Sequence, residues 1–235
     1  MLKTLQNAFK IKEVREKLLY TFFMLVVTRI GSQLPIPGVN TTFFQELFTR
    51  QSNDAFGFFN TITGGSFTNM SVFALSITPY ITSSIIMQLL TIAIPKLEEM
   101  QQEGEDGRKK IAEYTRYLTV ALALMQSVAM AIGFGGKGLL VEFTALNVIV
   151  AIVTMTAGSA MLMWIGERIT ENGVGNGISI VLLFNIISTM PSDMITLYER
   201  FLQGKIVAVA VVTAVIIVAV IVAMVVFVII LQDAE

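Results

Sequence analysis

The stretch IVAVAVVTAVIIVAVIVAMVVFVIIL, residues 206–231, contains no charged residue and consists mainly of Val, Ile and Ala. In water, so many β-branched residues would favour a strand. A bilayer core, however, requires about 20 consecutive apolar residues in a helix. Within lipid, a helix also satisfies every backbone polar group inside its own segment. Length and continuity therefore predict a transmembrane helix, and with it a helical membrane protein.

The composition of the whole chain favours the same class. Hydrophobic residues make up 54% of the 235 residues and charged residues 14%, whereas soluble domains carry roughly 25% charged residues. The net charge of −1 gives no electrostatic basis for binding nucleic acid. Cysteine and histidine are absent, which removes disulfides, thiol chemistry and the commonest metal ligand and general base. We therefore expect no metal site, no cofactor and no enzymatic activity.

Five further spans are expected along the chain. Three are clear, at residues 116–137, 142–167 and 175–193, whereas the first, at 18–34, is weaker because Arg29 lies inside it. The uncharged segment 55–95 is too long for one span, since as a single helix it would measure about 60 Å, twice the bilayer core. It must therefore be broken, and Gly64-Gly65 and Pro79 are the natural places.

The basic residues predict the orientation. Most of them lie before the first span or between the second and third: Lys3, Lys10, Lys12, Arg15, Lys17, Lys96, Arg108, Lys109, Lys110 and Arg116. The loops of the other side hold only Arg50, Lys137, Arg200 and Lys205. Because basic loops stay inside, both termini are expected in the cytoplasm. Segment 1–17 interleaves apolar and basic residues, which is typical of an amphipathic helix on the cytoplasmic surface or of a solvated basic tail.

The broken segment is the best candidate for a functional site. We expect residues 56–70 to form a half-helix that enters from the outside and 71–94 to complete the crossing; the alternative is an extracellular loop. Irregular backbone at membrane depth must be buried in protein or line a watery cavity, and channels and transporters place their sites at such breaks. Arg29, the one charge at membrane depth, either lines the interior or extends to the outer surface.

Short motifs occur in a recognisable order along the chain. They are RIGS at 29–32, PIPG at 35–38, GG at 64–65, FAL at 73–75, PYI at 79–81, GRKK at 107–110, YTRY at 114–117, WIGE at 164–167 and GVGNGIS at 173–179. This ordered set resembles the SecY family, the central subunits of the Sec protein translocon. The family has ten spans in two halves related by inverted pseudo-symmetry.

The resemblance implies an all-α membrane protein with six transmembrane helices and a re-entrant plug half-helix in span two. Residues 18–192 would form the N-terminal half, with spans one to five and a plug at about 56–70. Residues 205–232 would form span six, the start of a C-terminal half whose remaining spans the sequence does not include.

The resemblance also assigns roles to residues. Ile77 with Ile81 and Ile178 with Leu182 have i, i+4 spacing, so each pair shares a helix face. By the resemblance these four contribute to an apolar pore ring that passes a polypeptide and holds back ions. Aliphatic pairs in a membrane helix otherwise face lipid or neighbouring helices.

The plug and the lateral gate are assigned in the same way. The plug would comprise Phe59, Asn60, Thr61, Ile62, Thr63, Gly64, Gly65, Ser66 and Phe67. The gate positions would be Thr82 in span two and Gln126 in span three, where polar contacts between helices are weak, on the order of 1 kcal/mol. The competing interpretations are a fixed re-entrant segment and ordinary polar contacts between helices.

The function implied is that of a channel subunit of the general secretory pathway, without enzymatic activity. It would translocate unfolded polypeptides and release hydrophobic segments into the bacterial inner membrane. Implied partners are SecE and SecG, SecA or the ribosome at the cytoplasmic face, secretory polypeptides and the lipid bilayer, with no direct DNA binding. The alternatives are a truncated, non-conducting translocon fragment and a secondary transporter with broken helices. The absence of acidic residues within the spans disfavours the transporter.

Overall fold

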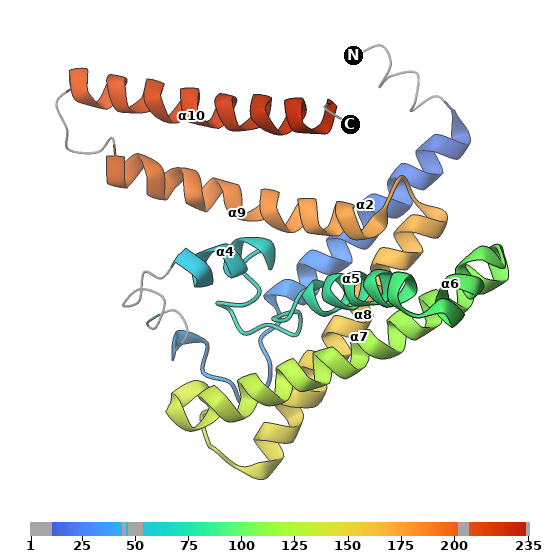
Figure 1. Cartoon of the computed structure of the whole chain (residues 1–235). Helices are drawn as coiled ribbons and strands as arrows, with labels where there is room; N and C mark the ends of the chain where they lie inside the picture. The colour runs from blue at the N-terminus through green and yellow to red at the C-terminus, as the bar shows by residue number, and fades with distance from the viewer. Residues whose placement is uncertain (1–10, 44–45, 47–53, 202–206, 234–235) are drawn as a thin grey trace. The chain divides into compact units, whose positions relative to one another are not determined.

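The computed structural model describes residues 11–43, 46, 54–201 and 207–233. The chain divides into two compact units, Met1–Ser188 and Thr189–Glu235, each of which has its own internal contacts. Helices dominate both units (Figure 1). The helices that begin in the first unit are α2 (Lys12–Gln33), α4 (Asp54–Ile62), α5 (Thr78–Ala93), α6 (Pro95–Gln102), α7 (Glu105–Phe134), a π-helical turn (Gly135–Leu139), α8 (Ala145–Asn172) and α9 (Gly177–Phe201). The second unit contains α10 (Val207–Asp233).

Helix α8 is central to the first unit because α2, α5 and α7 all pack against it. Two apolar cores result. The first is formed by α7, α8 and the turns that follow α4, and includes Met70, Leu75 and Met155. The second is formed by α2, α5, α8 and α9, and includes Ile77 and Ile165.

Small residues allow the close approach of α7 to α8. Ala123, Ser127 and Ala131 recur every fourth residue on α7 and are fully buried. Without large side chains, two helices can approach closely enough for dispersion and short hydrogen bonds to hold them in a membrane. The Ser127 and Thr156 hydroxyls meet at 2.9 Å across this contact.

Four helices are long and apolar enough to cross a membrane: Glu105–Leu139, Ala145–Asn172, Gly177–Thr196 and Val215–Gln232. They correspond to the four clear spans expected from the sequence, and the chain is a multi-pass membrane protein. A fifth span results if α5 and α6, bent by 101° at their junction, are counted as one. The expected count of six spans is therefore not confirmed.

The expected first span, at residues 18–34, lies in α2, which is not among the helices apolar enough to cross a membrane. Its 22 residues begin with charged side chains and contain Arg29 near the other end, so its mean hydropathy is low. Lys12–Lys17 lie in this same helix rather than in a separate one, whereas residues 1–10 of the expected interfacial helix lie outside the described residues.

The segment between α4 and α5 is broken where the sequence predicted. Helix α4 ends at Ile62, and Gly64 and Gly65 follow with φ of 66° and 81°, a left-handed region that glycine enters without strain. Turns then continue to Ile77, and α5 begins with Pro79 in its first turn, where a missing N–H costs nothing. The expected helices were too long on both sides, since residues 63–77 are not helical.

Gly158 of α8 gives a direct test of this packing. A Cβ atom there would lie 2.0 Å from the carbonyl oxygen of Val72, a backbone atom that cannot move aside. We expect Gly158→Ala to destabilise the protein by about 1–3 kcal/mol, measured as loss of ellipticity in a detergent denaturation series. The matched control is Gly133→Ala, because a Cβ at Gly133 of α7 meets nothing within 4 Å. Equal stability of the two variants would contradict the packing described.

Candidate functional site

The four residues expected in a pore ring lie around one core. Ile81, Ile178 and Leu182 are partly buried and pack against the second core, of which Ile77 is a fully buried member. The structure therefore brings Ile77, the N-cap of α5, and Ile81 together with the α9 pair. Ile77 differs from the other three because its side chain is enclosed by packed helices.

The turn between α8 and α9 fixes the position of the α9 pair. Asn176 caps α9, its Oδ1 accepting the N–H groups of Ile178 at 3.1 Å and Ser179 at 3.3 Å. The N–H of Gly177 donates to Thr170 Oγ1 at 2.9 Å. A Cβ on Gly177 would lie 2.0 Å from a carbonyl oxygen of α8, so glycine is required where the two backbones touch.

The residues assigned to the plug comprise the last turn of α4 and the turn after it, which are joined by side-chain contacts. Asn60 Oδ1 accepts hydrogen bonds from both the N–H of Thr68, at 3.3 Å, and its hydroxyl, at 2.8 Å. The rings of Phe59 and Phe67 meet edge to face with centroids 4.9 Å apart. Thr63, Ser66 and Phe67 are buried, whereas residues 59–62 are partly buried.

The far end of the plug segment is anchored to the loop after α2. The N–H of Ile36 donates to the carbonyl of Met70 at 3.0 Å, and the N–H of Val72 donates to that of Leu34 at 2.9 Å. Ser76, which precedes Ile77, accepts two hydrogen bonds of 3.3 Å. Its carbonyl oxygen accepts one from the Ser159 hydroxyl of α8, and its Oγ accepts one from Asn185 Nδ2 of α9. The irregular backbone of residues 63–77 thus finds hydrogen-bond partners inside the protein, as its depth requires.

Among the described residues, no hydrogen bond joins the two residues assigned to the gate, Thr82 and Gln126. The Thr82 hydroxyl donates to the carbonyl of Thr78 in its own helix at 3.1 Å. Gln126 lines a mostly apolar groove of about 420 Å³ together with Phe59, Phe67 and Thr78. The hydroxyl of Thr78 is buried and has no hydrogen-bond partner among the described residues.

The sequence did not predict the hydrogen bond that joins α5 to α7. Ser83, fully buried, donates to the carbonyl of Thr115 at 2.8 Å. Serine is common in membrane helices, and nothing in the spacing distinguished Ser83 from its neighbours. A search for small polar residues on the buried face of α5 would have found it.

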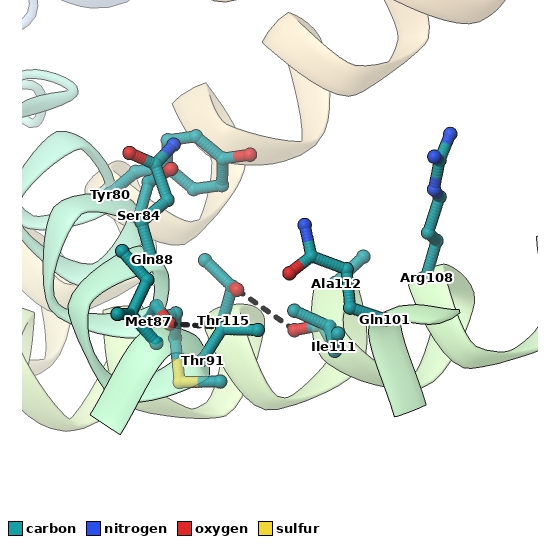
Figure 2. Close-up of a pocket in the computed structure, with 11 residues that line it drawn as sticks. Tyr80, Ser84, Met87, Gln88, Thr91, Gln101, Arg108, Ile111, Ala112 and Thr115 are labelled. Carbon is teal, nitrogen blue, oxygen red and sulfur yellow. Dashed lines mark hydrogen bonds between the residues drawn. The ribbon is translucent and has the colours of Figure 1, made fainter. Parts of the chain in front are cut away.

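A second groove, of about 470 Å³, lies where α5, α6 and α7 meet (Figure 2). Its lining mixes apolar and polar side chains: Tyr80, Ser84, Met87, Gln88, Thr91, Ile92, Gln101, Arg108, Ile111, Ala112 and Thr115. Thr91 and Thr115 direct their hydroxyls to carbonyls of their own helices, at 2.6 Å and 2.8 Å. The sharp bend between α5 and α6 folds these helices around the groove.

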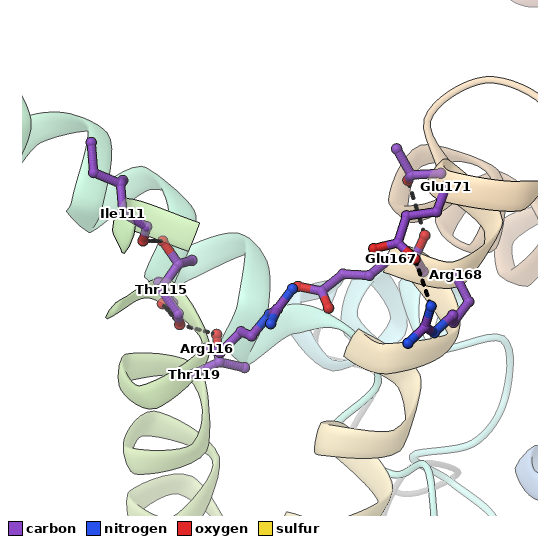
Figure 3. Close-up of polar contacts among 10 residues, drawn as sticks. Ile111, Thr115, Arg116, Thr119, Glu167, Arg168 and Glu171 are labelled. Atoms are coloured by element: carbon purple, nitrogen blue, oxygen red, sulfur yellow. Dashed lines mark hydrogen bonds and ion pairs between the residues drawn. The ribbon is translucent and has the colours of Figure 1, made fainter. Parts of the chain in front are cut away.

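An ion pair joins α7 to α8 at the end nearest this groove (Figure 3). Arg116 Nε donates to Glu167 Oε1 at 2.8 Å, and Arg168 pairs with Glu171 on α8 at 2.7 Å. The Arg116 side chain is 48% exposed, so solvent screening limits the pair to about 1 kcal/mol or less. The described residues contain no group of three His, Cys, Asp or Glu side chains placed to hold a metal ion.

Comparison with known proteins identifies the family. The SecY family model matches residues 71–235, more than half of the chain and including α5 to α10. The chain belongs to the SecY family. Its expected resemblance to that family is thereby confirmed.

Curated SecY relatives are similar over most of this chain. The protein translocase subunit SecY of Halalkalibacterium halodurans is 43% identical over 206 residues, which cover 86% of this chain and 47% of the relative. That of Bacillus subtilis is 42% identical over 204 residues, covering 85% of this chain and 46% of the relative. The chain therefore spans about half the length of the curated relatives it matches.

Solved structures agree on the fold. The Sec61 channel of the canine ribosome–channel complex from the endoplasmic reticulum has a TM-score of 0.52 and 21% identity, and the match covers 86% of this chain and 43% of that chain. A structure titled as a protein conducting channel matches with the same values. The all-helical, SecY-like fold expected from the sequence is thus confirmed.

The difference in burial between Ile77 and Ile81 generates a prediction. Ile77→Ala would leave a cavity in a packed core and should destabilise the protein by about 2–5 kcal/mol. Ile81→Ala, at a partly buried position four residues further along the chain, should cost less than half of that. Detergent denaturation of the two variants measures both. Equal losses of stability would mean that Ile81 is also a packing residue and would weaken its assignment to a pore.

Proposed function

We propose that this chain is the plug-bearing N-terminal part of a protein-conducting channel of the general secretory pathway, in the bacterial inner membrane. One observation supports this most strongly: a mostly buried, non-helical segment, residues 63–77, ends at Ile77, whose core is packed by Ile81 of α5 and by Ile178 and Leu182 of α9. Irregular backbone at membrane depth is tolerated where it is enclosed by protein or lines a water-filled path. The SecY relatives, which are named protein translocase subunits, favour the path.

The chemistry of the four aliphatic residues suits this task. Ile77, Ile81, Ile178 and Leu182 would contribute to the pore ring. The side chains of Ile81, Ile178 and Leu182 would touch a passing polypeptide without selecting its sequence, because they form no hydrogen bonds. A narrow apolar constriction also excludes water and ions when no polypeptide fills it. Ile77 would support the ring from behind, since it is fully buried.

The end of α4 and the turn that follows it would act as the plug of this channel. Its polar groups, such as Asn60 and Thr68, are paired with one another, so the turn can move as a unit and remain satisfied in water. Its aromatic pair, Phe59 and Phe67, gives it an apolar surface. A plug built in this way can leave and return without exposing unpaired backbone groups.

Release of hydrophobic segments into lipid would take place beside α5 and α7. Thr82 and Gln126 lie on these helices, and Gln126 borders an open groove with a mostly apolar lining. Because polar contacts between membrane helices are weak, a hydrophobic segment could replace them there. The opposite side of such a gate would come from the C-terminal spans of the channel.

The proposed partners act at the membrane and at the cytoplasmic face. SecE and SecG would contact the channel within the bilayer, and SecA or the ribosome would bind its basic loops. Arg108, Lys109 and Lys110 are exposed at the start of α7, and such a cluster attracts an acidic surface or ribosomal RNA. The matched Sec61 structure is itself titled as part of a ribosome–channel complex. Energy would come from these partners, and this chain would not be an enzyme.

The domain organisation proposed is that of the family. Residues 18–192 would form the N-terminal half, with its plug at about 56–70, and residues 205–232 the first span of the C-terminal half. Segment 1–17 would lie on the cytoplasmic side, where its residues 12–17 form the first turns of α2. Conduction would then require the further spans that the longer SecY relatives contain.

Site-specific crosslinking tests the conducting role. A photoreactive amino acid at Ile81 or Ile178 should crosslink to a stalled secretory polypeptide when the C-terminal spans of a SecY relative are supplied with this chain. The matched control is Val153, an aliphatic residue of α8 that is 58% exposed and not assigned to the ring. It should give no crosslink.

The outcomes separate the candidates. Crosslinks at both ring positions only with the C-terminal spans present would support half of a channel. Crosslinks with this chain alone would indicate that it assembles a pore by itself. If neither position crosslinks in either case, the chain is a non-conducting translocon fragment and the proposed function is wrong.

The orientation is tested by thiol labelling, since the chain has no cysteine of its own. Gln102→Cys, at the end of α6, should react with a membrane-impermeant maleimide only after the cells are opened. Glu142→Cys, between α7 and α8, should react in intact spheroplasts. Both positions are exposed. The reverse pattern would place the termini outside the cytoplasm and contradict the assignment from the basic residues.

A further inference from the structure

Arg29 of α2 contacts the plug segment. Its Nη1 atom donates to the carbonyl oxygen of Gly64 at 2.9 Å and to Ser188 Oγ of α9 at 3.1 Å, with Ser32 Oγ at 3.5 Å. These three acceptors come from the plug segment, from α9 and from α2 itself. One guanidinium therefore connects the plug to two helices that lie far apart in the sequence.

Hydrogen bonds of their own orient the two hydroxyl groups that accept from Arg29. The Ser188 hydroxyl donates its hydrogen to the carbonyl of Asn185 at 2.7 Å, and the Ser32 hydroxyl donates its own to the carbonyl of Arg29 at 2.7 Å. With their hydrogens so used, both oxygens present lone pairs to the guanidinium. Hydrogen bonds to a charged donor are about twice as strong as neutral ones.

Gly64 is fitted closely to this site. It has φ of +66°, and a Cβ there would lie 3.1 Å from both Asn185 Cα and Ser188 Oγ. The absence of a side chain therefore lets the plug backbone approach α9 until its carbonyl reaches Arg29. The carbonyl of Gly64, unobstructed by a side chain, is thus complementary to the guanidinium of Arg29.

The charge of Arg29 has no carboxylate partner in the part of the chain that the structure describes. A cation near membrane depth without such a partner is costly unless polar groups surround it. Here the Gly64 carbonyl and the two hydroxyls supply that environment. If the plug left, Arg29 would lose its shortest hydrogen bond, and this loss favours the plug's return.

We propose that Arg29 is the positioning residue that holds the plug closed, by binding the Gly64 carbonyl while α9 holds Ser188 beside it. The proposal rests on the plug assignment in the proposed function. The far end of the segment is bound to the loop after α2 through Met70 and Val72. The Arg29 contact therefore holds the part of the plug that precedes Met70, in addition to the packing of Phe59 and Phe67 in the first core.

The test reads the position of the plug and needs no translocation. The thiol introduced by Ser66→Cys reports on it, because Ser66 is 2% exposed in the closed plug and the chain has no other cysteine. The rate of reaction with a water-soluble maleimide is measured in membrane vesicles that contain the full chain. Adding Arg29→Met, which keeps the length but removes the donors, should make this reaction about tenfold faster.

Three further variants serve as controls. Arg29→Lys should give an intermediate rate, because an ammonium group keeps the charge but not the planar fork. Arg15→Gln removes an exposed cation from the same helix and should leave the rate unchanged. A second reporter, Ser127→Cys, is fully buried between α7 and α8 and should stay unreactive in every variant.

The reaction rates at positions 66 and 127 distinguish the possible outcomes. A faster reaction at position 66 but not at position 127 supports the proposal, and an unchanged rate overturns it. If both reporters react faster, Arg29→Met has loosened the whole fold, and Ser188→Ala, which keeps Arg29, decides instead. A smaller increase in the reaction rate at position 66 in Ser188→Ala supports the role of Arg29 in holding the plug, and an unchanged rate overturns it. A rise at position 66 together with failed crosslinking of secretory chains would show that the proposed function alone is wrong.

Discussion

The structure depends on one constraint: inside a bilayer every backbone polar group needs a partner from the protein. Long helices satisfy it within themselves, as α8 and α10 do. Residues 63–77 cannot, because they form turns, so they must be enclosed. The packing of α2, α5, α8 and α9 is arranged around that need, and Ser159, Asn185 and the loop after α2 all supply hydrogen bonds to the turns.

Small and polar side chains provide the contacts that make this enclosure possible. Glycine lets α8 touch the turns at Gly158 and lets α9 touch α8 at Gly177. Hydroxyl groups then join the helices at Ser83 and Ser127. Since each such bond in a membrane is weak, on the order of 1 kcal/mol, the turn segment is held by many modest contacts. A segment held in this way would be displaced without unfolding the helices around it, as the proposed plug requires.

Much of this fold could be predicted from the sequence, and the exceptions have physical causes. Uncharged runs identified four spans, and Gly64-Gly65 marked the break after α4, because both features act locally. The extent of the turns to Ile77 was missed, since their partners come from helices distant in the sequence. For the same reason the inward contact of Arg29 and the burial of Ile77 could not be deduced. The roles of Ile81, Ile178, Thr82 and Gln126 remain predictions that rest on the family resemblance.

The proposed plug, at about residues 56–70, would close a water-filled path. Ion conductance across a planar bilayer tests this claim most directly, with this chain incorporated together with the C-terminal spans of a SecY relative. The intact chain should hold the membrane nearly ion-tight, and removal of the turn at residues 61–68 should produce a measurable leak. If the two preparations conduct equally, the turns seal no path, and the segment is a fixed part of the helix packing.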